Sequence, residues 1–126
     1  MKKIIVFIVL TSTFILAERF EIRGDTVYDS LTELTWQKNP SKSDKHSIAE
    51  IMCTDPWHLP HIDELKSLVD YTKSPAIATT LIKIETDDYY WTSSQGDSSS
   101  WWVVNFYYGN GFWYLNDYNS YVLCVQ

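Results

Sequence analysis

Two cysteines and three histidines are the residues of this 126-residue chain best suited to covalent or metal chemistry. Cys53 and Cys124 lie far apart in the sequence, and export to an oxidising compartment would favour a disulfide between them. The alternative is a zinc site, because His58 and His61 follow Cys53 closely. That spacing is not a standard one for zinc, and two prolines interrupt it. We therefore expect a disulfide and no metal site.

Other polar clusters give weak signals for catalysis. The serine run 98–100 belongs to no Gly-x-Ser-x-Gly pattern, the signature of a nucleophile elbow. Asp87 and Asp88 are adjacent, so on a strand their side chains would point to opposite faces and would not form a glycosidase pair. His46 is expected at the surface or as a helix cap. We therefore do not expect an enzyme, because the sequence shows no motif that would bring a nucleophile, a base and an orienting group together.

One triplet gives a partial signal for calcium. Leu115-Asn116-Asp117 resembles the Trp-Asn-Asp triplet of calcium-dependent sugar-binding lectins. The Glu-Pro-Asn or Gln-Pro-Asp triplet that accompanies it in those lectins does not occur in this sequence. Calcium also requires six or more oxygen ligands. The sequence therefore predicts neither a metal nor a cofactor.

Residues 1–17 have the three parts of a secretory signal peptide. Lys2 and Lys3 precede an apolar run, and Ala17 is a small residue before the charged Glu18. A membrane anchor would need about 20 apolar residues, more than this interrupted run supplies. Cleavage would leave one domain, residues 18–126, in the periplasm or outside the cell, with no stable membrane insertion. Losing two lysines moves the formal charge from −6 to −8, which disfavours nucleic acid and anionic membranes as partners.

A loop followed directly by a helix is expected to organise the fold. Trp57 and Leu59 supply apolar residues that we expect to be buried anchors, and Pro60 fixes one backbone angle. Apolar residues then recur three and four positions apart, which predicts a helix over 61–71. Upstream, the pattern predicts two short strands within residues 25–37 and a first helix before the loop.

The C-terminal third is rich in aromatic side chains, which favour strands over helix. Asn110-Gly111 is the usual signature of a two-residue hairpin turn, which would pair Tyr108 with Trp113. Four strands are predicted, separated by the Ser-rich loop 93–100 and by shorter turns, over residues 89–92, 101–108, 112–116 and 121–125.

The two faces of the predicted hairpin differ in character. One face is expected to pack on the helices and carries Trp102, Val104, Phe106, Tyr108, Trp113 and Leu115. The other face presents tyrosine rings beside amides, a combination that suits the apolar face and the hydroxyl groups of a sugar. An ordinary half-exposed sheet is the alternative. The candidate ligand-binding residues on this face are Asn105, Tyr107, Tyr114, Asn116 and Tyr118.

Four short motifs occur in an order shared with a known family. They are Thr32-Glu33-Leu34-Thr35-Trp36-Gln37, Trp57-His58-Leu59-Pro60-His61-Ile62-Asp63-Glu64-Leu65, Tyr90-Trp91-Thr92-Ser93 and Leu123-Cys124-Val125-Gln126. Residues 25–126 thereby resemble the DUF1566 family, also called the Lcl C-terminal domain after a collagen-like adhesin. The motif residues to which the resemblance gives a structural role are Trp57, Leu59, Pro60, Glu64, Leu65 and Trp91.

The resemblance implies an α+β, C-type-lectin-like fold in which two helices pack on an irregular antiparallel sheet rich in aromatics. It also implies an exported bacterial protein without established catalytic residues, and some adhesins bind glycans through this domain. We therefore expect a non-catalytic binding module for a glycan or for an extracellular protein. The alternatives are a small structural or interaction domain without a small-molecule ligand and, more distantly, an enzyme related to the formylglycine-generating enzymes.

This chain departs from the family pattern at several motif positions. His58, Leu123 and Gln126 stand where the family has arginine, and His61 stands where it has a helix-capping threonine. Arginine commonly binds anionic groups. Its loss, together with the negative charge of the chain, argues against a sulfated polysaccharide as the ligand.

Overall fold

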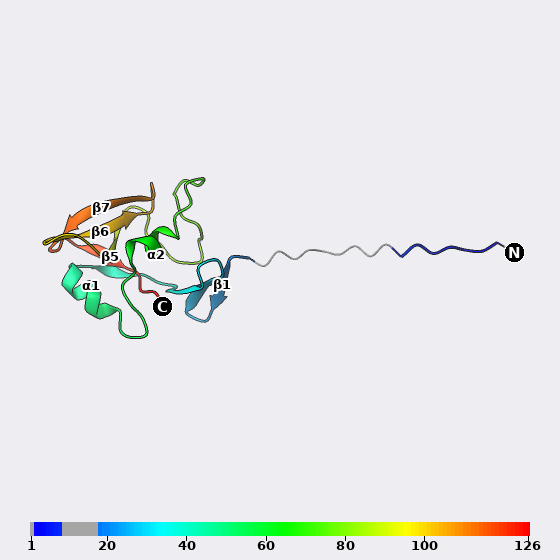
Figure 1. Cartoon of the computed structure of the whole chain (residues 1–126), viewed down its shortest axis with the longest axis horizontal. Helices are drawn as coiled ribbons and strands as arrows, with labels where there is room; N and C mark the ends of the chain where they lie inside the picture. The colour runs from blue at the N-terminus through cyan, green and yellow to red at the C-terminus, as the bar shows by residue number, and fades with distance from the viewer. Residues whose placement is uncertain (1, 9–17) are drawn as a thin grey trace.

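The computed structural model describes residues 2–8 and 18–126, and the second range forms two sheets and two helices (Figure 1). The α+β class is thereby confirmed. The signal-peptide prediction falls mainly on residues 1 and 9–17, outside the described residues. Neither helix of the described part has the length and apolar character that crossing a bilayer requires.

The two sheets differ in size and are formed by different parts of the chain. The smaller sheet has the strand order β1-β2-β3 and contains β1 (Phe20–Arg23), β2 (Thr26–Asp29) and β3 (Leu34–Gln37). The helices are α1 (His46–Met52) and α2 (Ile62–Lys66). The larger sheet has the order β4-β8-β5-β6-β7 and contains β4 (Ser41–Asp44), β5 (Tyr89–Asp97), β6 (Ser100–Asn105), β7 (Asn110–Leu115) and β8 (Ser120–Val122).

The larger sheet is buried on both faces at its centre. Tyr90 and Val104 are cross-strand partners that pack on one face with Leu65 and its neighbours around α2. Trp91 and Val103, the next partners along, pack on the opposite face with α1 and the two cysteines. Side chains alternate between faces along a strand, so a sheet covered on both sides has no polar stripe. The aromatic composition of the C-terminal third follows from this arrangement.

Two expectations about the larger sheet are wrong. The sheet is mixed and not purely antiparallel, because β8 runs parallel to β5 where Tyr121 lies opposite Tyr90. Residues 93–97, expected in a loop, continue β5, and register shifts in its pairing with β6 accommodate the polar residues. Such bulges leave some residues unpaired and bend the strand, while pairing resumes on either side of them.

The connection between β6 and β7 also differs from the prediction. Asn105 lies opposite Asn110, so the turn consists of residues 106–109 and Asn110-Gly111 belongs to β7. The Oδ1 atom of Asn105 accepts the backbone N–H groups of Tyr107 and Tyr108, at 2.8 and 3.3 Å. Gly109 completes the turn at a φ of 78°, a conformation that favours glycine. These contacts favour the four-residue turn over the two-residue one.

The revised register corrects the predicted faces only in part. Val104 and Phe106 are buried beside α2, as expected. Trp113 pairs with Trp102 and not with Tyr108, and Tyr107 lies in the turn and so does not pair with Tyr114. The predicted and observed registers keep Trp102 and Trp113 on one face. The part of that face on β7 is not covered by the core, however: Trp113 is 56 % exposed and Leu115 is 44 % exposed.

Candidate functional site

The two cysteines form a disulfide, which confirms the first prediction. The Sγ atoms of Cys53 and Cys124 are 2.03 Å apart, and both residues belong to the core beneath α1. The bond joins the residue after α1 to the residue before Val125, which forms an isolated bridge with His58. Because Cys53 is consumed in the disulfide, a zinc site built on its thiolate is excluded.

The loop before α2 is held by the carboxylate of Glu64. This carboxylate accepts the backbone N–H of His61 at 2.9 Å and lies 3.0 Å from Nε2 of His58. Nδ1 of His61 lies 3.0 Å from Oγ of Ser93 on β5. His58 therefore braces the loop, and His61 connects the helix start to the sheet. These contacts indicate a structural role.

The motif residues of this loop and of α2 are buried to different degrees. Leu59, Pro60 and Leu65 are buried, as the motif implies. Trp57 is half-buried and packs against the core cluster that contains Trp91, so its prediction as a buried anchor holds only in part. It lines a polar hollow together with Lys38 and other residues around the end of β3. Trp91, another residue of the four motifs, is fully buried.

His46 occupies a site that the sequence did not predict. It is only 2 % exposed, and its ring stacks on Trp101 at a centroid distance of 3.8 Å. Its Nε2 donates to the carbonyl oxygen of Thr92 at 2.8 Å, while Nδ1 lies 3.6 Å from Glu50. Burial lowers the pKa of His46, although the contacts with Thr92 and Glu50 oppose that change. The expectation of a surface or capping histidine is therefore wrong.

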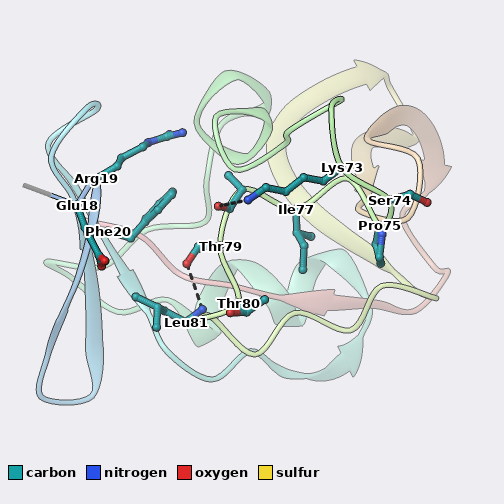
Figure 2. A pocket seen from close by; sticks show the side chains of 11 residues that line it. Glu18, Arg19, Phe20, Lys73, Ser74, Pro75, Ile77, Thr79, Thr80 and Leu81 are labelled. Atoms are coloured by element: carbon teal, nitrogen blue, oxygen red, sulfur yellow. Dashed lines mark hydrogen bonds between the residues drawn. The ribbon is translucent and has the colours of Figure 1, made fainter. Parts of the chain in front are cut away.

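One hollow in the surface lies between the start of β1 and the loop 73–81 (Figure 2). Its volume is about 660 Å³. Figure 2 shows Phe20 on one wall and Thr79 on the other. The cations around it are engaged within the protein, since Arg19 forms a paired contact with the carboxylate of Asp29 and Lys73 donates to a backbone carbonyl. Its two cationic side chains are therefore already occupied by contacts within the protein.

A second hollow lies at the β6–β7 turn, with a volume of about 400 Å³. We call it the tyrosine hollow. The rings of Tyr107 and Tyr108 are nearly perpendicular, with centroids 4.8 Å apart, and are 42 % and 67 % exposed. The residues that line it are Thr86, Asp87, Asn105, Tyr107 and Tyr108. It therefore combines exposed aromatic faces with a carboxylate, a hydroxyl and an amide.

The predicted ligand-binding residues fall into two groups. Asn105 and Tyr107 line the tyrosine hollow, whereas Tyr114 and Tyr118 contact each other on the same side of the sheet, with ring centroids 5.2 Å apart. Tyr89 lies between the groups, because it is the strand partner of Asn105 and its ring centroid is 4.7 Å from that of Tyr114. Burial raises the pKa of the Tyr114 phenol, and Tyr89 adds to the effect.

Two features of these groups were not expected. Asn116 is exposed, and its carbonyl oxygen accepts the N–H of His46 at 3.3 Å, so its backbone supports the start of α1. Thr86 and Asp87 were not predicted as site residues. The one signal in the sequence was the acidic pair that Asp87 forms with Asp88 directly before an aromatic strand.

Comparison with known proteins places the chain in a family. The chain matches no curated protein. The family model described as the Lcl C-terminal domain matches residues 25–126, which include both helices, the larger sheet, both cysteines and every residue of the tyrosine hollow. The chain therefore belongs to the Lcl C-terminal domain family.

Proposed function

We propose that this protein is an exported, non-catalytic module that binds a glycan in the tyrosine hollow. The main support for the proposal is that two exposed tyrosine rings, the Asp87 carboxylate and the Thr86 hydroxyl line the same hollow. An aromatic face packs against the C–H groups of a sugar ring, and neighbouring polar groups bind its hydroxyls. The residues match this chemistry without requiring a nucleophile or a metal.

The charge of the hollow narrows the class of glycan. Asp87 accepts hydrogen bonds from sugar hydroxyls but repels sulfate and carboxylate groups. The negative formal charge of the chain acts in the same direction. We therefore propose a neutral glycan.

The proposal includes a C-type-lectin-like arrangement and export of the domain. The arrangement is supported by the pairing of β3 with the C-terminal segment, where Thr35 and Gln126 exchange two backbone hydrogen bonds of 2.7 and 2.9 Å. Export is supported by the signal-peptide pattern of residues 1–17 and by the disulfide. A protein partner in place of a glycan is the alternative.

A glycan array probed with oxidised residues 18–126 tests the proposal, followed by calorimetry on the best ligand. Asp87→Asn is expected to weaken binding by roughly 10- to 100-fold, the usual effect of losing a hydrogen bond to a charged group. Asp88→Asn is the matched control, because it removes the same charge from the adjacent residue, which does not line the hollow.

The aromatic contribution has its own pair of variants. Tyr107→Ala should weaken binding by about tenfold, whereas Tyr118→Ala, at a similar exposure of 49 %, should leave it unchanged. Binding that resists both Asp87→Asn and Tyr107→Ala in folded protein would reject the hollow as the site. An array without any bound glycan would reject the function.

A further inference from the structure

Strand β7 forms an open edge of the larger sheet (Figure 1). Its only strand partner among the described residues is β6. Within the same part of the chain, residues 110–114 make no backbone hydrogen bond outside that ladder. Open edges of this kind are templates for pairing with another strand.

The sequence of β7 leaves this edge unprotected. Its six residues, Asn-Gly-Phe-Trp-Tyr-Leu, include no charge and no proline, and all six pair with β6 without a register shift. The opposite edge strand, β4, carries Lys42 and Asp44 and has a register shift against β8. Charges and bulges are the usual means of blocking edge pairing. One edge of the sheet is therefore protected and the other is open.

The hydrogen bonds at the end of β7 show which backbone groups face outward. The N–H of Asn116 donates to the carbonyl oxygen of Ser99, on the β6 side. Because the backbone groups of successive residues alternate in direction along a strand, those of Gly111, Trp113 and Leu115 point away from β6. The carbonyl oxygen of Leu115 already accepts the N–H of Tyr118 at 3.0 Å, and the other outward groups remain open.

We propose that β7 pairs antiparallel with β7 of a second copy of this chain, about a two-fold axis at Trp113. In this register Trp113 lies opposite its own copy, and Leu115 lies opposite Gly111. The absence of a side chain at Gly111 leaves room for Leu115 of the other copy. An added Cβ at Gly111 would already lie 3.3 Å from the Trp102 ring, so this small residue fits both its own strand pair and the second copy.

The proposed pairing covers the apolar side chains that the isolated chain exposes. Trp113 and Leu115, 56 % and 44 % exposed, lie on the same face as Trp102, whose ring centroid is 5.4 Å from that of Trp113. Two copies would bring four indoles together. Lys66, whose Cε lies 3.4 Å from the Cβ position of Gly111, would also approach the end of the other β7, where Asp117 supplies an opposite charge. The contact is therefore complementary in shape and in charge.

The symmetry would have a consequence for binding. A two-fold axis perpendicular to the sheet keeps the same face of both copies on the same side. If the tyrosine hollow binds a glycan as proposed above, two hollows would face one glycan surface, and avidity would increase the apparent affinity. The dimer itself does not depend on that function.

Cysteine cross-linking tests the register directly. Residues opposite each other across the axis have Cα atoms about 5.5 Å apart, within the range of a disulfide, whereas diagonal positions are about 7–8 Å apart and exceed it. Under mild oxidation, Trp113→Cys should therefore form covalent dimers at least about tenfold faster than Phe112→Cys, its matched control on the opposite face. Equal rates for the two variants, or no dimer from either, would overturn the register.

Light scattering of the unmodified protein tests the dimer without any glycan. The wild-type domain should show twice the chain mass, and Trp113→Lys should show the mass of one chain because it adds a charge to the open edge. Ile22→Lys, at the comparably exposed β1 position, should stay dimeric. Near-ultraviolet circular dichroism confirms that each variant is folded. A wild-type protein that remains monomeric at every concentration would overturn the proposal while leaving the glycan site open to test.

Discussion

Removing the disulfide should cost this domain a large share of its stability. The perturbation is the double variant Cys53→Ala and Cys124→Ala, which keeps apolar side chains at two buried positions. The two cysteines are separated by 71 positions in the sequence, and on the chain-entropy model a loop of that length stabilises the native state by about 4 kcal/mol at 25 °C. A domain of this size is typically stable by about 5–15 kcal/mol.

The loss should be concentrated at α1. This helix has only seven residues, no side-chain hydrogen bond at its N-cap Lys45, and neither acids in its first turn nor bases in its last. A helix this short depends on tertiary contacts. Its contacts are the buried side chains of His46 and Ala49, together with the disulfide directly after its last residue. Without the disulfide, α1 should open before the rest of the domain unfolds.

Two measurements check this reasoning. Urea unfolding of the wild type and the double variant should give free energies of unfolding that differ by about 4 kcal/mol, and hydrogen exchange should accelerate more in α1 than in β6. Reduction of the wild type supplies a control, because it breaks the bond without changing the sequence. A loss under about 1 kcal/mol would refute the loop-closure estimate. Equal acceleration in both elements would refute the assignment to α1.

Three further predictions concern other parts of the molecule. Because burial lowers the pKa of His46, the unfolded chain binds a proton at this residue more readily than the folded one, and stability should fall as pH decreases below about 6.5. In urea unfolding at several pH values, His46→Gln should reduce this dependence, and parallel pH profiles of the variant and the wild type would contradict it. Leu65→Ala should destabilise the domain by about 2–5 kcal/mol, because Leu65 is fully buried. Trp57→Ala should cost less than the about 3–5 kcal/mol typical of a fully buried tryptophan, because Trp57 is half-buried, and a loss within that range in thermal unfolding would be inconsistent with the structure. Intact mass of the exported protein should correspond to a chain that begins at Glu18, and retention of residues 1–17 would reject the predicted cleavage.

Local signals were sufficient for several elements. The position of α2 after Pro60 follows from the three- and four-residue spacing of its apolar residues, although the helix ends at Lys66 and not near Tyr71. The two strands within residues 25–37 are also present, since β2 and β3 have regular patterns and tight turns. The third strand of that sheet, β1, was missed because Glu21 and Arg23 interrupt its apolar character.

The β6–β7 register shows where local reasoning fails. Asn110-Gly111 alone favours a two-residue turn. Gly109 instead closes a longer turn, where its carbonyl oxygen accepts the hydroxyl of Tyr71 and where an added Cβ would lie 2.5 Å from Val69. Both contacts come from the segment after α2. The choice between the two turns therefore depends on packing against a distant part of the chain.

The family, the pairing of the cysteines and the class of fold could be predicted from the sequence alone, because each depends on residue types or on motifs in a fixed order. The burial of His46 on Trp101, and the position of Asp87 beside Tyr107 in one hollow, are seen only in the folded domain. These residues lie far apart along the chain. The pairing of β5 with β6 brings Asp87 beside Tyr107, and the packing of α1 on these strands brings His46 onto Trp101. Contacts of this kind arise from sheet order and register, which depend on the packing of the whole domain and not on local patterns.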